Sequence, residues 1–408
     1  MRSCLFITTQ FPYPLDNGGK IGAFNGLSVI SANYNVTVLS FSEEMQYVDE
    51  GIDYFKNKLP NVQFKKPIRH DIHIRKKPFT LVKVMAKDFL YSLPYVTIKF
   101  ENQSMYRAID KQFENGNCYD IVFIDYLNMG IYQNYIQKKY SGQYSEIILK
   151  DHNIEFEIVR QTVKNEFGFK KAILNREWKV TKKYEEYCIK NADRTFSVCD
   201  DNTEFLKQNN KNAYTMLPTF EMLPKRKQTI EHNILYMGNL SWGANLEGLR
   251  WFVDQVMPKI IKKVPDAKLT VVGSGPNKEV FANYGFVNYL GYVKDISHIY
   301  DDQKVFVVPL FEGSGIRIKI LEAFNNEIAV VSTTLGCGTI GASDKKEIMI
   351  ADDKEKFAES VIELLLNTEF NKKMVFNSKL FLEKKYSLQA RQQEFWETVN
   401  GKEENSLS

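Results

Sequence analysis

The feature that most constrains the fold of this chain is a repeated alternation of short apolar runs with longer segments of helical period. Continuous apolar runs that alternate with helices are typical of parallel sheets covered on both faces. One helical segment, 245–264, carries its apolar residues on one stripe and ends before Pro265. The sequence therefore predicts an α/β fold, with strands at 4–9, 35–41, 120–125, 146–151, 194–199, 233–238, 268–273, 304–310 and 328–333.

The length of 408 residues exceeds what one ordinary hydrophobic core supports, so two domains are expected. A polar, aperiodic stretch with two prolines, 207–232, is the expected linker. We expect one domain over 1–215, completed by a crossing helix at 387–408, and a second over 216–386. Because parallel sheets bind ligands at the carboxyl ends of their strands, two Rossmann-like sheets would face a central cleft.

Composition excludes several classes of protein. The chain is 44% hydrophobic and 25% charged, as soluble globular proteins are, and it has no apolar run of about 18 residues that would cross a membrane. The N-terminus reads as a first strand and not as a signal peptide. Five scattered cysteines predict reduced thiols and a cytoplasmic chain. The net charge of +4 identifies no partner, and no nucleic-acid recognition module is evident.

The segment 304–333 reads as strand, loop, helix and strand, and its loop holds Gly313, Ser314 and Gly315. Glycines let a backbone approach a ligand closely. A helix that begins near Ile316 would present unpaired N–H groups and a positive dipole end to an anion such as phosphate. The loop therefore indicates an anion site, although a tight turn without a ligand would have the same composition.

Three ionisable residues follow in this helix. Arg317 and Lys319 can add positive charge for a diphosphate. Glu322 lies among apolar residues, where a carboxylate costs free energy unless it is paired, and a ribose diol would offer it two hydrogen-bond donors. The alternative is an internal helix pair between Lys319 and Glu322.

Five stretches together resemble glycosyltransferase family 4 over nearly the whole chain, most weakly over 42–118. They are FPYPLDNGGKIGAFNGLSVI (11–30), DHNIE (151–155), the segment from ILYMGNLSWG to GSGP (234–276), the segment from VFVVPLFEGSG to GCGTI (305–340), and SLQARQQEFWETV (387–399). The resemblance implies the GT-B fold, with two Rossmann-like domains, and transfer of a sugar from a nucleotide-sugar with retention of configuration.

The resemblance also implies roles for single residues. Glu322 would hold the nucleotide ribose, and His152 would sit beside the transferred sugar, with Arg317 and Lys319 stabilising the leaving charge. The donor would lie mainly on the second domain and the acceptor on the first. The residues expected at the nucleotide-sugar are Gly18, Gly19, Gly238, Asn239, Gly273, Gly313, Ser314, Gly315, Ile316 and Glu322.

The reaction implied by the resemblance is transfer from a UDP- or GDP-linked sugar to a glycan, lipid-linked or protein-linked acceptor in bacterial surface polysaccharide or glycoconjugate synthesis. No D-x-D motif and no cluster with metal-ligand spacing occurs, so neither a metal nor another cofactor is expected. Ser314 stands where the family commonly has a glutamate. This departure leaves open a catalytically silent partner subunit, and a nucleotide-sugar epimerase is the other alternative.

The window 64–87 holds eight Lys or Arg residues against one Asp, interleaved with apolar residues. Such a segment can lie peripherally on an anionic membrane, at its inner face, and bring a lipid-linked acceptor to the site. A solvated basic loop over a core helix explains the same pattern. Both interpretations stay open from sequence alone.

Overall fold

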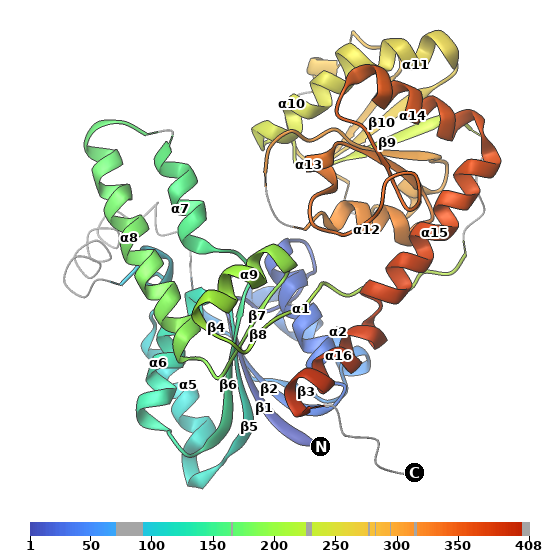
Figure 1. Ribbon diagram of the computed structural model, residues 1–408. Coiled ribbons are helices and arrows are strands. Elements are labelled where there is room, and N and C mark those ends of the chain that lie inside the picture. The colour runs from blue at the N-terminus through green and yellow to red at the C-terminus, as the bar shows by residue number, and fades with distance from the viewer. Residues whose placement is uncertain are drawn as a thin grey trace. The chain divides into compact units, whose positions relative to one another are not determined.

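The computed structural model describes residues 1–70, 93–164, 166–225, 231–275, 278–281, 283–293, 295–313 and 316–401. The chain forms two compact units, Met1–Thr219 with Arg391–Ser408, and Phe220–Ala390 (Figure 1). Each unit is a parallel sheet flanked by helices, which confirms the predicted α/β class. All nine strands predicted from sequence are present, with bounds shifted by a few residues.

The first unit is built on the strand order β3-β2-β1-β5-β6-β7-β8, with β4 paired to β2. Its strands are β1 (Arg2–Thr8), β2 (Tyr34–Ser42), β3 (Val62–Phe64), β4 (Ile68–Arg69), β5 (Tyr119–Asp125), β6 (Tyr144–Asp151), β7 (Arg194–Ser197) and β8 (Ala213–Thr215). Its helices are α1 (Gly18–Ile30), α2 (Val48–Lys58), α4 (Tyr95–Ile98), α5 (Gln103–Phe113), α6 (Gly130–Lys139), α7 (Glu155–Lys164), α8 (Gly168–Asn191), α9 (Asp200–Asn209) and α16 (Leu388–Asn400).

Strand β1 shows why this sheet is covered on both faces. Leu5 and Ile7 point into the core that α5 and α6 cover. Phe6 points to the opposite face and stacks on Phe123 of β5 with ring centroids 5.1 Å apart. Phe395 of α16 packs against Phe123 on that face, so the last helix of the chain completes the first unit. Burial on both faces explains the continuous apolar runs in the sequence.

The second unit has the strand order β11-β10-β9-β12-β13-β14. Its strands are β9 (Asn233–Met237), β10 (Lys268–Val272), β11 (Val287–Gly291), β12 (Val305–Val308), β13 (Ala329–Ser332) and β14 (Met349–Ile350). Its helices are α10 (Gly243–Trp251), α11 (Met257–Lys263), α12 (Ile318–Asn325), α13 (Thr334–Cys337), α14 (Lys354–Leu366) and α15 (Thr368–Tyr386), with a π-helical stretch over Phe252–Val256 that joins α10 to α11.

Two sequence expectations need correction. The predicted linker, 207–232, is not wholly irregular, because β8 lies inside it and pairs with β7. This strand was missed because it is short and its sequence, Ala213–Thr215, has no apolar run. The predicted helix 245–264 is interrupted by the π-helical stretch, which periodicity does not reveal.

All five cysteines are free thiols, and only Cys118 is exposed. Among the described residues, no helix has the length and apolar character needed to cross a membrane.

Candidate active site

In the first unit, a buried charge network lies at the carboxyl ends of β1, β5 and β6. His152 follows β6, and its Nε2 atom lies 2.7 Å from Oδ1 of Asp125, the last residue of β5. The hydroxyl of Thr8, at the end of β1, donates to Oδ2 of Asp125 at 2.8 Å. Nζ of Lys150 lies 3.8 Å from Oδ1 of Asp125. Parallel strands end at one edge of the sheet, so three separate segments meet here.

The carboxylate of Asp125 is ionised. Burial opposes its charge, but interactions with His152 and Lys150 and a hydrogen bond from Thr8 outweigh burial and lower its pKa. Burial is the largest cause of the lowered pKa of His152, and the charge of Lys150 adds to it. The imidazole is therefore neutral at pH 7. Its contact with Asp125 assigns the proton to Nε2 and leaves Nδ1 as an acceptor.

Glycines in α1 allow this helix to approach the network closely. A Cβ atom at Gly22 would lie 2.7 Å from Cε1 of His152 and 3.2 Å from the hydroxyl of Tyr126. The Tyr126 ring stacks on His152 with centroids 3.6 Å apart, and its hydroxyl donates to the carbonyl of Gly19 at 3.2 Å. The predicted residues Gly18 and Gly19 thus form the first turn of a helix that rests on His152.

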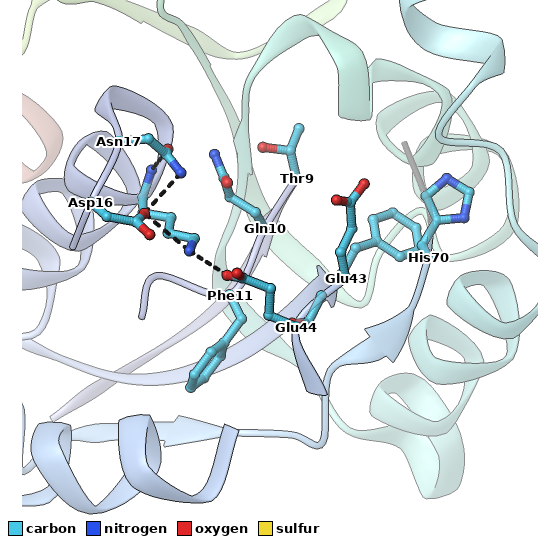
Figure 2. Close-up of a pocket in the computed structure, with 11 residues that line it drawn as sticks. Thr9, Gln10, Phe11, Asp16, Asn17, Glu43, Glu44 and His70 are labelled. Atoms are coloured by element: carbon cyan, nitrogen blue, oxygen red, sulfur yellow. Dashed lines mark hydrogen bonds and ion pairs between the residues drawn. The ribbon is translucent and has the colours of Figure 1, made fainter. Parts of the chain in front are cut away.

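A pocket of about 470 Å³ lies beside this glycine turn, beyond the ends of β1 and β2 (Figure 2). Lys20 of α1 reaches Asp16 at 3.1 Å and Glu44 at 2.9 Å, and this pair of contacts joins α1 to the segment after β2. Asn17 caps α1 by accepting from the backbone N–H of Lys20 at 3.0 Å. The pocket is lined by Thr9, Gln10, Phe11, Asp16, Asn17, Lys20, Phe41, Ser42, Glu43, Glu44 and His70.

In the second unit, three polar side chains converge on Gly238, just beyond β9. Nζ of Lys319 lies 3.3 Å from Oδ1 of Asn245 and 5.5 Å from the centre of the Tyr236 ring. The Asn245 amide donates to the carbonyl of Asn239 at 2.9 Å. A Cβ atom at Gly238 would lie 3.1 Å from both Lys319 Nζ and the Tyr236 hydroxyl. Glycine at this position therefore leaves room for the ammonium group at the strand end.

Helix α12 carries Glu322 and Lys319 on a largely buried surface. Burial raises the pKa of Glu322 to about 7, and Lys319 opposes this shift. Burial also lowers the pKa of Lys319 to about 8, with Arg317 adding to the shift and Glu322 opposing it. Among the described residues no hydrogen bond or ion pair joins the two side chains, and Lys319 reaches Asn245 instead. The helix pair between Lys319 and Glu322, which the sequence left open as an alternative, is therefore not formed as a direct contact.

The expected start of this helix near Ile316 is wrong by two residues. The helix begins at Ile318, because Arg317 has non-helical backbone angles and occupies the N-cap position. Burial lowers the pKa of Arg317, and its guanidinium donates to the carbonyl of Leu335 at 3.5 Å. The positive end of the helix and the guanidinium are thus adjacent.

The loop after β12 passes against Trp242. A Cβ atom at Gly313, where φ is +106°, would lie 2.7 Å from the Trp242 ring and 3.4 Å from the guanidinium of Arg317. Trp242 is 45% exposed, so it forms one wall of this loop and is not a core residue. Of the other predicted loop residues, Ile316 is partly buried, and Ser314 and Gly315 lie outside the described residues.

Two further predicted residues have clear structural roles. At Gly273, where φ is +146°, a Cβ atom would lie 1.8 Å from the carbonyl oxygen of Gly238. The two glycines allow the ends of β9 and β10 to touch. Asn239 accepts hydrogen bonds from the Ser241 N–H at 2.9 Å and the Ser274 hydroxyl at 3.2 Å, which orders the turn after β9.

Sequence reasoning missed Asp125, Tyr126, Lys150 and Gly22. The strand-end rule could have found Asp125, because it closes the predicted strand at 120–125 beside His152. A repeat of glycine at every fourth position in α1 marks a helix face that accepts close neighbours, and Gly22 is its central member.

Comparisons with known proteins agree with this architecture. Residues 231–367 match the family described as Glycosyl transferases group 1. A Klebsiella pneumoniae protein described as an uncharacterized 44.6 kDa protein in the cps region is 24% identical over 411 residues, covering 95% of this chain and 97% of the relative.

Solved structures resemble the chain over nearly its full length. HepE of Anabaena, in complex with UDP, has a TM-score of 0.62 at 10% identity and covers 98% of this chain and 100% of its own. A mutant of S. aureus TarM, in complex with fondaparinux, alpha-GlcNAc-glycerol and UDP, has a TM-score of 0.61 at 11% identity, with 98% and 100% covered. The chain therefore has the GT-B fold, and its match to Glycosyl transferases group 1 lies within the second unit.

Proposed function

We propose that this chain is a glycosyltransferase that moves a sugar from a nucleotide-sugar to a glycan, lipid-linked or protein-linked acceptor, with retention of configuration and without a metal ion. The observation that carries the proposal is the largely buried carboxylate of Glu322 on an apolar helix. This group has a pKa of about 7 and lies one helical turn from Lys319. A ribose diol would supply the two donors that this carboxylate needs in order to stay charged.

The nucleotide class is supported by two further findings. Glu322 lies within the segment that matches Glycosyl transferases group 1. The structures of HepE and TarM named above were both determined with UDP. We therefore propose a UDP-linked donor, with GDP as the second nucleotide to be tested.

The leaving nucleoside diphosphate would be stabilised by groups on α12. The ammonium group of Lys319 extends from α12 to the end of β9. Arg317 lies at the N-terminus of α12, where the helix dipole adds positive character. Both side chains have lowered pKa values through burial, so an arriving diphosphate would favour their charged forms. These cations supply the charge that a metal ion would otherwise provide, which supports a metal-independent reaction.

His152 would position the transferred sugar. Its Nδ1 atom is an acceptor for a sugar hydroxyl because Nε2 is committed to Asp125. Asp125 is fully buried and occupied by His152, Thr8 and Lys150, so it is a poor candidate for a covalent nucleophile. Attack on the same face as the leaving group is therefore the proposed route to retention.

The acceptor belongs, in this proposal, to bacterial surface polysaccharide or glycoconjugate synthesis in the cytoplasm. The support is the relative described as encoded in a cps region. The basic window 64–87 lies mostly outside the described residues, so its peripheral contact with an anionic membrane stays a prediction.

The test is calorimetry with UDP, GDP and their sugar conjugates, followed by assay of nucleoside diphosphate release with candidate acceptors. Wild type, Glu322→Ala and Glu363→Ala are compared, because Glu363 is an exposed glutamate on α14 in the same unit. We expect wild type and the control Glu363→Ala to bind one of the two nucleotide series with equal affinity. Glu322→Ala should bind the same series at least tenfold more weakly. Equal binding by a folded Glu322→Ala would reject the ribose role. Binding with no release under any acceptor would favour a silent partner subunit.

A further inference from the structure

Two buried carboxyl groups lie beside the turn that carries His152, and the proposed transfer does not use them. Asp151 is the last residue of β6 and is 1% exposed, and Glu185 of α8 is fully buried. Successive side chains of a strand point to opposite faces of the sheet. Lys150 reaches Asp125 on one face, so Asp151 points to the other face, where α8 packs. There the two acids lie within hydrogen-bond range of each other.

The Glu185 carboxylate binds the N-terminus of α7, the helix that lies beside α8 in Figure 1. Its Oε1 atom accepts from the backbone N–H of Glu155 at 2.9 Å, and its Oε2 atom accepts from that of Phe156 at 3.0 Å. The first N–H groups of a helix have no partner within the helix, and the helix dipole favours negative charge there. These two bonds therefore favour the ionised form of Glu185 and hold the start of α7 against α8.

Asp151 differs, because no N–H or O–H group of the described residues donates to its Oδ2 atom. Its neighbour Glu185 already uses both oxygens as acceptors. Two ionised carboxylates at this range in a buried site would repel each other strongly. One proton on Asp151 removes the repulsion and supplies an O–H group that donates to Glu185. Burial is the largest cause of the raised pKa of both acids; Glu185 adds to the shift of Asp151, whereas the hydrogen bond from Asp151 opposes that of Glu185.

We propose that Asp151 and Glu185 share one proton and that they are positioning residues for His152. The turn 152–154 joins Asp151 to the first residue of α7, so the pair holds both ends of the turn. One end is held through β6, and the other through the two N–H groups that Glu185 binds. His152 is thereby kept 2.7 Å from Asp125. The role of His152 at the sugar rests on the proposed function above, whereas the shared proton rests on these contacts alone.

Loss of the shared proton at alkaline pH would release the turn. An acid whose pKa is raised by folding stabilises the folded state at low pH, and this contribution is lost as pH rises through the folded value. Of the groups around the pair, Glu155 adds like charge, and burial raises its own pKa while the charge of Lys99 opposes that shift. Cys188 lies near the pair and Tyr126 lies near Glu155, and both stay protonated because burial raises their pKa values. The charge of Glu155 therefore favours a proton on the pair.

The experiment compares wild type, Asp151→Asn and Asp151→Leu as full chains. The Asn amide donates to Glu185 at every pH, whereas Leu fills the space and donates nothing. Quench-flow hydrogen exchange with mass spectrometry measures the protection of the first-turn amides of α7, corrected for intrinsic exchange. In wild type this protection should fall by about tenfold or more between pH 7 and pH 9.5, since one pKa unit corresponds to a tenfold change. Asp151→Asn should keep its protection over this range, and Asp151→Leu should be less protected than both already at pH 7.

Glu186→Gln is the matched control, because Glu186 is the next acid on α8 and its partner is Lys182 at 3.8 Å. This variant should follow wild type at every pH. The shared proton is overturned if protection in wild type and Asp151→Asn changes in parallel with pH, or if Asp151→Asn is as poorly protected as Asp151→Leu. If Asp151→Leu does not fold, the comparison of wild type with Asp151→Asn decides.

His152 is followed by NMR on the same samples, and its ring signal is assigned by its absence in His152→Ala. Because His152 is already neutral at pH 7, its signal should change at alkaline pH in wild type only if the turn moves, and it should stay constant in Asp151→Asn. A signal that stays constant in wild type while the amides lose protection overturns the positioning role. Turnover and UDP affinity are measured alongside, and kcat of Asp151→Leu should fall by about tenfold or more with UDP affinity unchanged. The expected exchange and NMR results without transfer to any acceptor count against the proposed function and not against the pair.

Discussion

Replacing Glu322 by Gln should make the fold more stable and nucleotide binding weaker. Burial raises the pKa of this carboxyl from 4.5 to about 7. An acid with a raised pKa stabilises the folded state at low pH, and this contribution is lost as pH rises from the unfolded value toward the folded value. At about 1.4 kcal/mol per pKa unit, the shift costs the wild type about 3 kcal/mol of unfolding free energy above pH 7. An amide avoids this cost because it stays neutral.

The assay is urea unfolding of both proteins across pH. The stability advantage of Glu322→Gln should be about 2 kcal/mol larger at pH 8 than at pH 5.5, where the carboxyl is mostly protonated in the folded state. Both free-energy differences are upper limits, because replacing Glu322 also removes the carboxylate that raises the pKa of Lys319. The same variant should bind UDP at least tenfold more weakly. Parallel pH profiles for the two proteins, or a variant less stable at pH 8, would contradict a raised pKa of Glu322.

Three other outcomes follow from the same geometry. His152→Ala should lower kcat more than UDP affinity, and equal losses would place this residue at the nucleotide. Gly273→Ala should destabilise the second unit by at least about 1 kcal/mol, because the new Cβ atom would lie 1.8 Å from a backbone oxygen. Gly243→Ala is the control and should not destabilise it, because no atom lies within 4 Å of its Cβ position. Turnover should survive excess EDTA, and activity that returns only with added magnesium or manganese would contradict the metal-independent proposal.

Much of the fold was predictable from sequence because the strands are buried on both faces. Runs such as 120–125 and 304–310 are continuous and apolar, and each corresponds to a strand. The short strands β8 and β14 were missed, because a few residues at a sheet edge carry no periodic signal. The π-helical stretch at Phe252–Val256 was also missed, because it preserves the apolar stripe of the predicted helix.

The candidate site was predictable where chemistry and local pattern coincide. Glu322 could be singled out because an isolated acid on an apolar helix is unusual. No local pattern identifies the partners of His152: Asp125 could be suspected only from its place at a predicted strand end, and the sheet order is what brings it to His152. The pocket was beyond sequence reasoning for the same reason. Its acids follow β2 and precede α1, and neither stretch has a recognisable spacing.

A crystal structure of the chain with UDP bound would test the role of Glu322 most directly. We predict that both ribose hydroxyls donate to the Glu322 carboxylate and that the diphosphate lies within reach of Lys319 and the N-terminus of α12. UDP bound in the second unit with its ribose away from Glu322, or bound only in the first unit, would contradict it.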